Sequence, residues 1–157
     1  MEYYKFLRQY VGHQPIQLVG AGVLIYKNNK ILLQRRTDNR TYGKHGGVVD
    51  LYESTEECAR RELTEEIGVK VGKLTLLGVY SGREMTVEYM NGDIANYVDI
   101  VYITDELLNE PSPDNYETDG VEWFDIDALP DNINKNDREP INDLVKYLKE
   151  RQSCSKN

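Results

Sequence analysis

The apolar positions early in the chain form two strand-sized runs. Residues 16–26 (IQLVGAGVLIY) and 31–36 (ILLQRR) are rich in Val, Ile and Leu, and the polar segment KNNK separates them. Asparagine is common in tight turns because it tolerates a left-handed backbone. The pattern therefore predicts two strands joined by a turn. The polar, glycine-containing segment 37–47 predicts a loop after the second strand.

A helical period replaces the strand pattern in residues 53–68, ESTEECARRELTEEIG. Its apolar residues at every fourth position form one stripe, as expected for a helix that packs on a core. These residues are Ala59, Leu63 and Ile67. Ser54 or Thr55 can cap the start of the helix, and Gly68 stands where a C-terminal cap is expected. We therefore expect a helix that ends near Ile67.

The rest of the chain mixes both periods. Strands are predicted at 73–82, 84–90 and 94–104, with a hairpin turn at 91–93. Shorter or mixed segments are a helix or an amphipathic lead-in of mixed character at 2–11, a strand or extended entry at 48–52, a surface loop at 108–120, a strand leading into a helical turn at 121–130, and a helix at 138–152. Such an order without regular alternation predicts an α/β fold, a mixed β-sheet with helices on its faces, in a single domain spanning residues 1–157.

The charge balance narrows the possible partners. The net charge is −8 over 157 residues, which argues against general nucleic-acid binding and against a membrane surface. Cys58 and Cys154 are far apart in the sequence and fit neither a disulfide framework nor a zinc site. The N-terminal segment lacks an unbroken apolar run, so we expect neither a signal peptide nor a membrane anchor. These features predict a cytoplasmic protein.

The predicted helix at 53–68 carries an unusual excess of carboxylates. Glu62, Glu65 and Glu66 share one face of it. Like charges four residues apart destabilise a helix by about 0.2–0.5 kcal/mol per pair. A divalent cation would offset this repulsion, because clustered carboxylates form a hard oxygen site suited to Mg²⁺ or Mn²⁺.

The spacing of this region resembles a known motif. Gly47 is followed after five residues by Glu53, and after seven more by the segment RELTEEIGV, residues 61–69. This resembles the Nudix box at every fixed position and at both aliphatic positions. The resemblance implies an αβα sandwich with a mixed β-sheet, and a metal-dependent hydrolase of phosphoanhydride bonds.

Carried over to this chain, the resemblance implies roles for individual residues. The expected metal ligands are the side-chain carboxylates of Glu62, Glu65, Glu66 and Glu117 and the backbone carbonyl of Gly47. Catalytic roles are expected for Glu62, Glu65, Arg61 and Glu53, the last two orienting the carboxylates and tying the preceding loop to the helix. Arg61 is also four residues from both Glu57 and Glu65, so an ordinary helix ion pair is an alternative reason for its presence. The general base is either Glu62 or Glu117.

Three arginines before the box are candidates for binding substrate phosphates. Arg35, Arg36 and Arg40 could each make bidentate contacts to a phosphate. The alternation of the strand also allows Arg36 to be an ordinary solvent-facing residue. His13 and His45 are too isolated in the sequence to argue for a catalytic pair.

The chain departs from the usual family pattern at the edges of the box. Lys44 and His45 stand where relatives have Leu-Pro, and Asp50 is shorter than the usual acidic residue. Tyr52 replaces a glycine. If position 52 requires a positive φ, a tyrosine there is strained.

These observations predict a Mg²⁺-dependent pyrophosphohydrolase that cleaves a nucleoside diphosphate linked to another moiety. Two alternatives are a nucleoside-triphosphate pyrophosphohydrolase and, because of the altered positions 44, 45 and 52, a sensor that binds a nucleotide without hydrolysing it. The expected partner is a small-molecule nucleotide substrate, and the family resemblance also suggests a homodimer.

Overall fold

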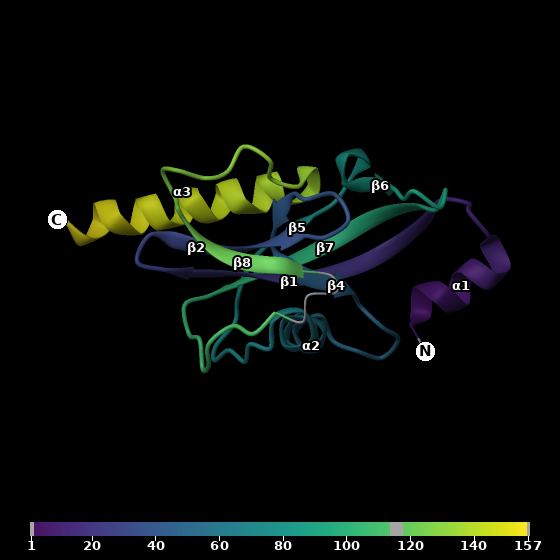
Figure 1. The fold of residues 1–157 in the computed structure, drawn as a ribbon, viewed down its shortest axis with the longest axis horizontal. Helices are drawn as coiled ribbons and strands as arrows, with labels where there is room; N and C mark the ends of the chain where they lie inside the picture. The colour runs from purple at the N-terminus through teal and green to yellow at the C-terminus, as the bar shows by residue number, and fades with distance from the viewer. Residues whose placement is uncertain (1, 114–117, 157) are drawn as a thin grey trace.

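The computed structural model describes residues 2–113 and 118–156 as a mixed sheet between helical layers. Figure 1 shows α3 on one face of the sheet, α2 on the other, and α1 at one end. The helices are α1 (Tyr3–Val11), α2 (Thr55–Ile67) and α3 (Arg138–Ser155). The strands are β1 (Ile16–Lys27), β2 (Lys30–Arg36), β3 (Tyr42–Gly43), β4 (His45–Val48), β5 (Thr75–Tyr80), β6 (Thr86–Glu88), β7 (Ile94–Thr104) and β8 (Thr118–Asp125). The predicted mixed α/β fold is confirmed.

The sheet is built around β1. This strand runs parallel to β7 from Ile16 to Ile25 and pairs antiparallel with β2 only near the turn that joins them. Asn28 and Asn29 have positive φ angles of 49° and 60° in that turn, as the sequence predicts. β5 ends the path of paired strands on the far side of β7, and β8 pairs with β2.

The prediction of a loop at 37–47 is wrong for the second half of the segment, which forms β3 and the start of β4. β1 and β2 diverge beyond their turn, and β3 and β4 fill the gap between them. β3 pairs with β2 through Gly43 opposite Gln34, and β4 pairs with β1 through His45 opposite Val23. The segment has no apolar run, with Tyr42 its one large hydrophobic residue, so its strand character comes from these backbone ladders, which short sequence patterns do not reveal.

Two apolar layers hold the sheet between α2 and α3. Along β1, Leu24 belongs to the cluster that packs under α3, whereas Val23 and Ile25 belong to the cluster under α2. A strand covered on both faces reads as a continuous apolar run. This explains why residues 16–26 show little alternation in the sequence.

The helix that carries the box forms for local reasons. Ser54 accepts a hydrogen bond from the amide of Glu57, whose side chain in turn accepts one from the amide of Ser54, so the two residues make a capping box. Gly68 ends the helix in the left-handed conformation with a φ of 65°. The predicted stripe of Ala59, Leu63 and Ile67 is fully buried. The predicted boundaries of this helix are therefore confirmed.

Other boundaries differ from the prediction. A 3₁₀ turn at Arg83–Met85 replaces the start of the strand predicted at 84–90, and β6 covers only Thr86–Glu88. β8 begins at Thr118, inside the loop predicted at 108–120, because these residues pair with β2. A simple turn, in which Ala128 donates to the carbonyl of Asp125, replaces the predicted helical turn.

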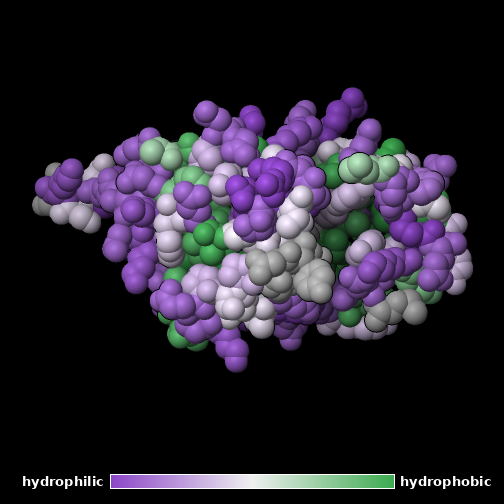
Figure 2. Space-filling model, viewed as in Figure 1, coloured by the Kyte–Doolittle hydropathy of each residue, from purple (hydrophilic) through white to green (hydrophobic). Residues whose placement is uncertain are grey.

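The surface on the face shown in Figure 2 is mostly hydrophilic, with hydrophobic residues visible chiefly in recesses. Within residues 2–113 and 118–156, no helix is both long enough and apolar enough to cross a membrane.

Candidate active site

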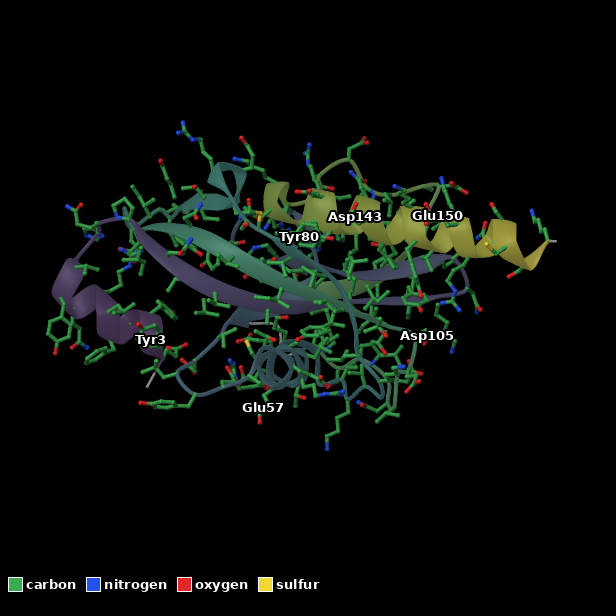
Figure 3. The ribbon with its side chains drawn as sticks, turned by 180° about the vertical axis from the view of Figure 1, so that it is seen from behind. Tyr3, Glu57, Tyr80, Asp105, Asp143 and Glu150 are labelled. Carbon is green, nitrogen blue, oxygen red and sulfur yellow. The ribbon has the colours of Figure 1, made fainter. Side chains whose placement is uncertain are left out.

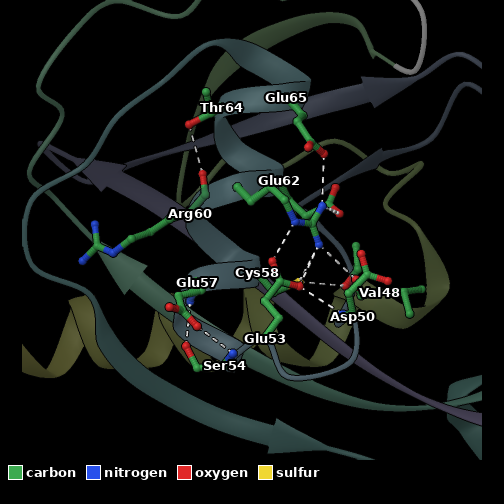
Figure 4. A network of polar contacts seen from close by, with 12 residues as sticks. Val48, Asp50, Glu53, Ser54, Glu57, Cys58, Arg60, Glu62, Thr64 and Glu65 are labelled. Carbon is green, nitrogen blue, oxygen red and sulfur yellow. Dashed lines mark hydrogen bonds and ion pairs between the residues drawn. The ribbon is translucent and has the colours of Figure 1, made fainter. Parts of the chain in front are cut away.

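Arg61 of α2 contacts three carboxylates, and Figure 4 shows this network from close by, with Glu53, Glu62 and Glu65 labelled. Its Nε and Nη2 atoms donate to the two carboxylate oxygens of Glu53, at 2.7 and 2.9 Å. Its Nη1 atom donates to Glu62 at 2.6 Å and to Glu65 at 3.1 Å. We call Glu53, Arg61, Glu62 and Glu65 the arginine cluster. All four are residues that the sequence predicts to be catalytic.

The bidentate pair has the geometry of a strong charge-assisted contact. Hydrogen bonding to Arg61 lowers the pKa of Glu53, and hydrogen bonding to Glu53 raises the pKa of Arg61. Arg61 Nη2 also donates to the carbonyl of Val48 at 3.2 Å. Arg61 therefore joins the end of β4, the following loop and the helix, whereas Glu57 contacts Ser54 in the capping box.

Two glycines of β4 lie directly against the helix carboxylates. The amide of Gly46 donates to the buried Glu66 carboxylate at 3.0 Å. A Cβ atom added at Gly47 would lie 2.4 Å from the carboxylate carbon of Glu62, so a side chain at position 47 would displace that carboxylate. Cys58 lies beside the Gly47 carbonyl, with its sulfur 3.8 Å from the oxygen. Burial raises the pKa of Cys58 to about 12, which keeps it a thiol at neutral pH.

The donor set suits a hard divalent cation. Glu62, Glu65 and Glu66 supply carboxylate oxygens from adjacent turns of α2, and the Gly47 carbonyl faces the same helix. In the described part of the chain, no three His, Cys, Asp or Glu side chains are already arranged to hold an ion. Arg61 now bridges Glu62 and Glu65, and the Glu65 side chain is 59% exposed, so it can rotate once it leaves Arg61. The chemistry of the residues fits such an ion, and their rotamers would have to adjust.

The candidate phosphate-binding arginines are engaged by carboxylates. Arg35 and Arg40 both pair with the same oxygen of Asp119, Arg35 at 2.7 Å. Arg36 instead makes two hydrogen bonds to Asp38, at 3.0 and 2.8 Å. The structure therefore brings two of the three arginines together at one carboxylate, and sequence reasoning missed that carboxylate.

A small cavity of about 130 Å³ lies beside this arginine pair. It is lined by Arg35, Tyr42, Asp119, Gly120, Val121 and Glu122. Glu117, which the sequence predicts as a metal ligand or general base, lies outside the described residues.

A second charge cluster is buried in the fold, and the sequence did not predict it. Lys44 Nζ lies 2.8 Å from Asp99 of β7 and 2.9 Å from Asp137, at the start of α3. We call these three residues the lysine cluster. Burial alone would lower the pKa of Lys44, but the charges of Asp137 and Asp99 outweigh it and raise the pKa. The only signal in the sequence was the unusual Lys44-His45 pair.

Glycines make room for the lysine cluster. A Cβ atom at Gly43 would lie 2.2 Å from an Asp137 oxygen, and one at Gly22 would lie 2.9 Å from Cε of Lys44. The cluster therefore fixes β3 and β4 against β1, β7 and the start of α3. It is a built feature of the interior rather than a chance surface ion pair.

His45 follows Lys44 in the sequence, and its side chain is completely buried. Its Nε2 atom lies 3.2 Å from the carbonyl of Leu32, and its Nδ1 atom has no hydrogen-bond partner in the described part of the chain. Burial lowers its pKa to about 4, so the ring is neutral at pH 7. A neutral ring with the proton on Nε2 donates to Leu32, which accounts for the contact.

Tyr52 adopts the conformation that the replaced glycine would favour. Its φ is 66° and its side chain is fully exposed. A left-handed backbone costs a non-glycine residue about 1–2 kcal/mol. The loop before α2 is therefore strained at this position, as expected for a tyrosine that must take a positive φ.

Comparisons with known proteins agree on one family. A model of the NUDIX domain matches residues 17–144. The chain is 30% identical over 126 residues to a putative 8-oxo-dGTP diphosphatase of Bacillus subtilis, covering 80% of this chain and 78% of that protein.

Two further curated relatives are longer. An ADP-ribose pyrophosphatase of Methanocaldococcus jannaschii is 34% identical over 115 residues, covering 71% of this chain and 64% of that protein. An NAD-capped RNA hydrolase, NudC, of Pseudomonas aeruginosa is 32% identical over 126 residues, covering 79% of this chain and 40% of that protein. This chain therefore spans less than two thirds of the length of either relative.

Solved structures support the same assignment. A MutT NUDIX hydrolase from Burkholderia pseudomallei superposes with a TM-score of 0.71 at 29% identity, covering 83% of this chain and 98% of that one. The MutT protein from Methanosarcina mazei Go1 shares the fold, with a TM-score of 0.69 at 19% identity, covering 87% of this chain and 98% of that one. With its box on α2 and its glycines against the helix carboxylates, this chain belongs to the Nudix family.

Proposed function

We propose that this protein is a divalent-metal-dependent pyrophosphohydrolase that cleaves a nucleoside diphosphate linked to another moiety. The arginine cluster carries the proposal, because it collects the box carboxylates around one guanidinium at the edge of the β4 strand. The Glu65 carboxylate is exposed and can change partner, which suits a site that must accept both a cation and a polyphosphate.

The residues have distinct proposed roles. Glu62, Glu65 and Glu66, with the Gly47 carbonyl, would hold Mg²⁺ or Mn²⁺, and Glu117 is a further candidate ligand. When bound, the ion supplies charge neutralisation for the pyrophosphate and a lowered pKa for a coordinated water. Arg61 and Glu53 orient the carboxylates through the bidentate pair. The general base is one of two carboxylates, Glu62 or Glu117.

Substrate phosphates are proposed to bind near the arginines that precede the box. Arg35 and Arg40 share Asp119, so an incoming phosphate would compete with a carboxylate for guanidinium groups that are already held together. Arg36, held by Asp38, is the third candidate. The expected partner is a small nucleotide.

Two observations bear on the substrate class. The relatives named ADP-ribose pyrophosphatase and NAD-capped RNA hydrolase favour a nucleoside diphosphate joined to another group. The relative named putative 8-oxo-dGTP diphosphatase aligns over more of its own length, and it favours the alternative of nucleoside-triphosphate hydrolysis.

A homodimer formed through β5 is the proposed assembly. β5 ends the path of paired strands, and its six residues, TLLGVY, carry no charge, with Leu76 and Val79 exposed. Edge strands that stay monomeric usually carry charges or prolines. In a chain with a net charge of −8, this strand lets a second copy approach without like-charge contacts along the paired strands.

The proposal is tested by hydrolysis of a nucleotide panel with Mg²⁺ or Mn²⁺. ADP-ribose and nucleoside-diphosphate sugars are compared with nucleoside triphosphates by measuring the phosphate products. Glu65→Gln and Glu66→Gln should each lower turnover by at least about 100-fold, since even loss of an outer-shell partner of a metal site costs 10–100-fold. The matched control is Glu56→Gln on the same helix, where Glu56 pairs with Arg60 at the surface.

Full activity of Glu65→Gln at saturating Mg²⁺ would contradict the proposal. Tight nucleotide binding without turnover in the unmodified protein would favour the sensor instead. Parallel measurements of turnover and of Mn²⁺ binding in Glu62→Gln and Glu117→Gln then identify the base, because loss of the base lowers turnover even when metal binding is intact.

A further inference from the structure

The N-terminal helix is capped by a residue of the box loop. The backbone amide of Tyr3, the first residue of α1, donates to Asp50 Oδ1 at 2.9 Å, across 47 positions of sequence. Glu2, which precedes the helix, makes no side-chain capping bond. A carboxylate that accepts from a free amide at a helix N-terminus is favourable for both the hydrogen bond and the helix dipole. Asp50 therefore takes the place of a local cap.

α1 is attached to the body of the protein mainly by polar contacts at its two ends. None of its residues is fully buried, and Phe6 and Tyr10 are exposed. At the far end, Arg8 donates to the carbonyl of Ile94, the first residue of β7, at 2.7 Å. Figure 3 shows Tyr3 at the end of α1 that faces α2. A helix held this way has little core packing, and such peripheral elements open at a lower free-energy cost than core strands.

Asp50 also holds the first glutamate of the box. Its backbone amide donates to Glu53 Oε2 at 3.0 Å, and its carbonyl accepts from the Glu53 amide at 3.2 Å. Glu53 in turn binds Arg61, which contacts Glu62 and Glu65. A continuous series of hydrogen bonds thus runs from the α1 backbone to the helix carboxylates.

The loop between β4 and α2 has little packing of its own. Leu51 and Tyr52 are exposed, and Tyr52 is in the left-handed region. The conformation of this loop therefore depends on hydrogen bonds, and the side chain of Asp50 directs one of them to α1. If α1 releases Asp50, the strained loop gains alternative conformations.

We propose that α1 is a positioning element for the metal-binding carboxylates and that Asp50 is the positioning residue through which it acts. With α1 docked, Asp50 holds the loop in the conformation that presents Glu53 to Arg61. The consequence for metal affinity rests on the proposed function, but the ordering of the loop does not.

A backbone substitution isolates this contact. Tyr3→Pro removes the donating amide together with the tyrosine side chain, and proline is compatible with the first position of a helix. Glu2 already has the extended backbone, at φ −63° and ψ 119°, that a residue before proline prefers. Tyr3→Ala is the matched control, because it removes the side chain and keeps the amide. Asp50→Ala removes the acceptor.

Hydrogen exchange of the metal-free full chain gives the first readout. Exchange of the amides of Asp50 and Glu53, which are hydrogen-bonded within this loop, should become about tenfold faster in Tyr3→Pro and in Asp50→Ala, as expected for loss of one charge-assisted hydrogen bond. It should stay unchanged in Tyr3→Ala. In the double variant that combines Tyr3→Pro with Asp50→Ala, these loop amides should exchange no faster than in Asp50→Ala alone, because both changes remove the same contact.

Mn²⁺ titration followed by electron paramagnetic resonance gives the second readout. The half-saturating concentration should rise about three- to tenfold in Tyr3→Pro, with turnover at saturating metal changed less than about twofold, since positioning residues act through ligand order. Equal loop exchange in Tyr3→Pro and Tyr3→Ala would overturn the proposal. If the unmodified protein hydrolyses nothing, the proposed function fails, and the exchange data still decide the role of α1.

Discussion

The chain places two cations among carboxylates in very different surroundings. Arg61 faces Glu53, Glu62 and Glu65, and its side chain is 31% exposed. Lys44 faces Asp99 and Asp137, and its side chain is 13% exposed. The arginine cluster lies where the strained loop that contains Tyr52 meets α2, whereas the lysine cluster connects β-strands to the start of α3.

This difference in burial predicts a difference in role. Charges removed from water are stable only while their partners are present, so a buried cluster constrains the fold. Exposed charges contribute little to folding because water and salt screen them. Within the arginine cluster Glu65 is 59% exposed, whereas Glu53 and Glu62 are 15% and 13% exposed. We therefore expect Glu65 to be the member that rearranges when the proposed cation binds, whereas the lysine cluster must stay intact for β3 and β4 to keep their place.

The largest expected effect is on folding and comes from Lys44→Met. It leaves two buried carboxylates without a cation, which costs about 3–5 kcal/mol of unfolding free energy. Denaturant unfolding measures the loss. The control is Lys149→Met, because Lys149 pairs with Asp127 at the surface, and its loss should cost less than about 1 kcal/mol. A Lys44→Met chain as stable as this control would contradict a structural role for the lysine cluster.

An acid-dependent loss of stability is the next largest effect and comes from His45. Its pKa falls from 6.5 to about 4 on burial, so the unfolded chain takes up a proton first as the pH drops. Stability should be full above pH 6.5 and fall by up to about 3 kcal/mol towards pH 4. Glu53, whose pKa is lowered from 4.5 by hydrogen bonding to Arg61, loses its contribution as the pH falls below about 4.5, so the upper part of this window belongs to His45.

Denaturant unfolding in EDTA at a series of pH values measures this loss. His45→Gln should flatten the stability curve between pH 6.5 and 5. An unchanged slope in that variant would show that another group controls the acid loss.

The smallest expected effect on stability, with a large effect on activity, comes from Arg61→Lys. Lysine keeps the charge but cannot make the bidentate contact to Glu53. Unfolding free energy should change by less than about 1 kcal/mol, since the group is partly exposed. Turnover should fall about 10–100-fold, as for other residues that orient metal ligands.

Arg60→Lys on the same helix is the control for Arg61→Lys, because Arg60 pairs with the exposed Glu56. Equal turnover in both variants would remove the distinction between the arginine cluster and an ordinary helix ion pair.

The box helix was predictable because its determinants are local. Ser54, Glu57 and Gly68 cap the helix through neighbours in the sequence, and the stripe of Ala59, Leu63 and Ile67 follows from the helical period. The contacts of Arg61 with Glu62 and Glu65 lie within two turns of the same helix. The strands of the core were predictable for the same reason, since their apolar runs are continuous.

Other features depended on contacts between distant segments. β3 and β4 form because β1 and β2 diverge, which no property of residues 37–47 reveals. Asp119 joins Arg35 to Arg40 only because β8 lies beside β2. The hydrogen bond from α1 to Asp50 likewise depends on where the helix docks.

The sequence by itself determined the Nudix box with its carboxylates and the mixed α/β fold, because the spacing of these residues along the chain encodes local geometry. Only the tertiary structure decided that Lys44 is a buried ion-pair centre, that two arginines share one aspartate, and that α1 is coupled to the box loop. These contacts join residues far apart in the chain, and the free energy of a buried charge depends on which partners the fold brings to it.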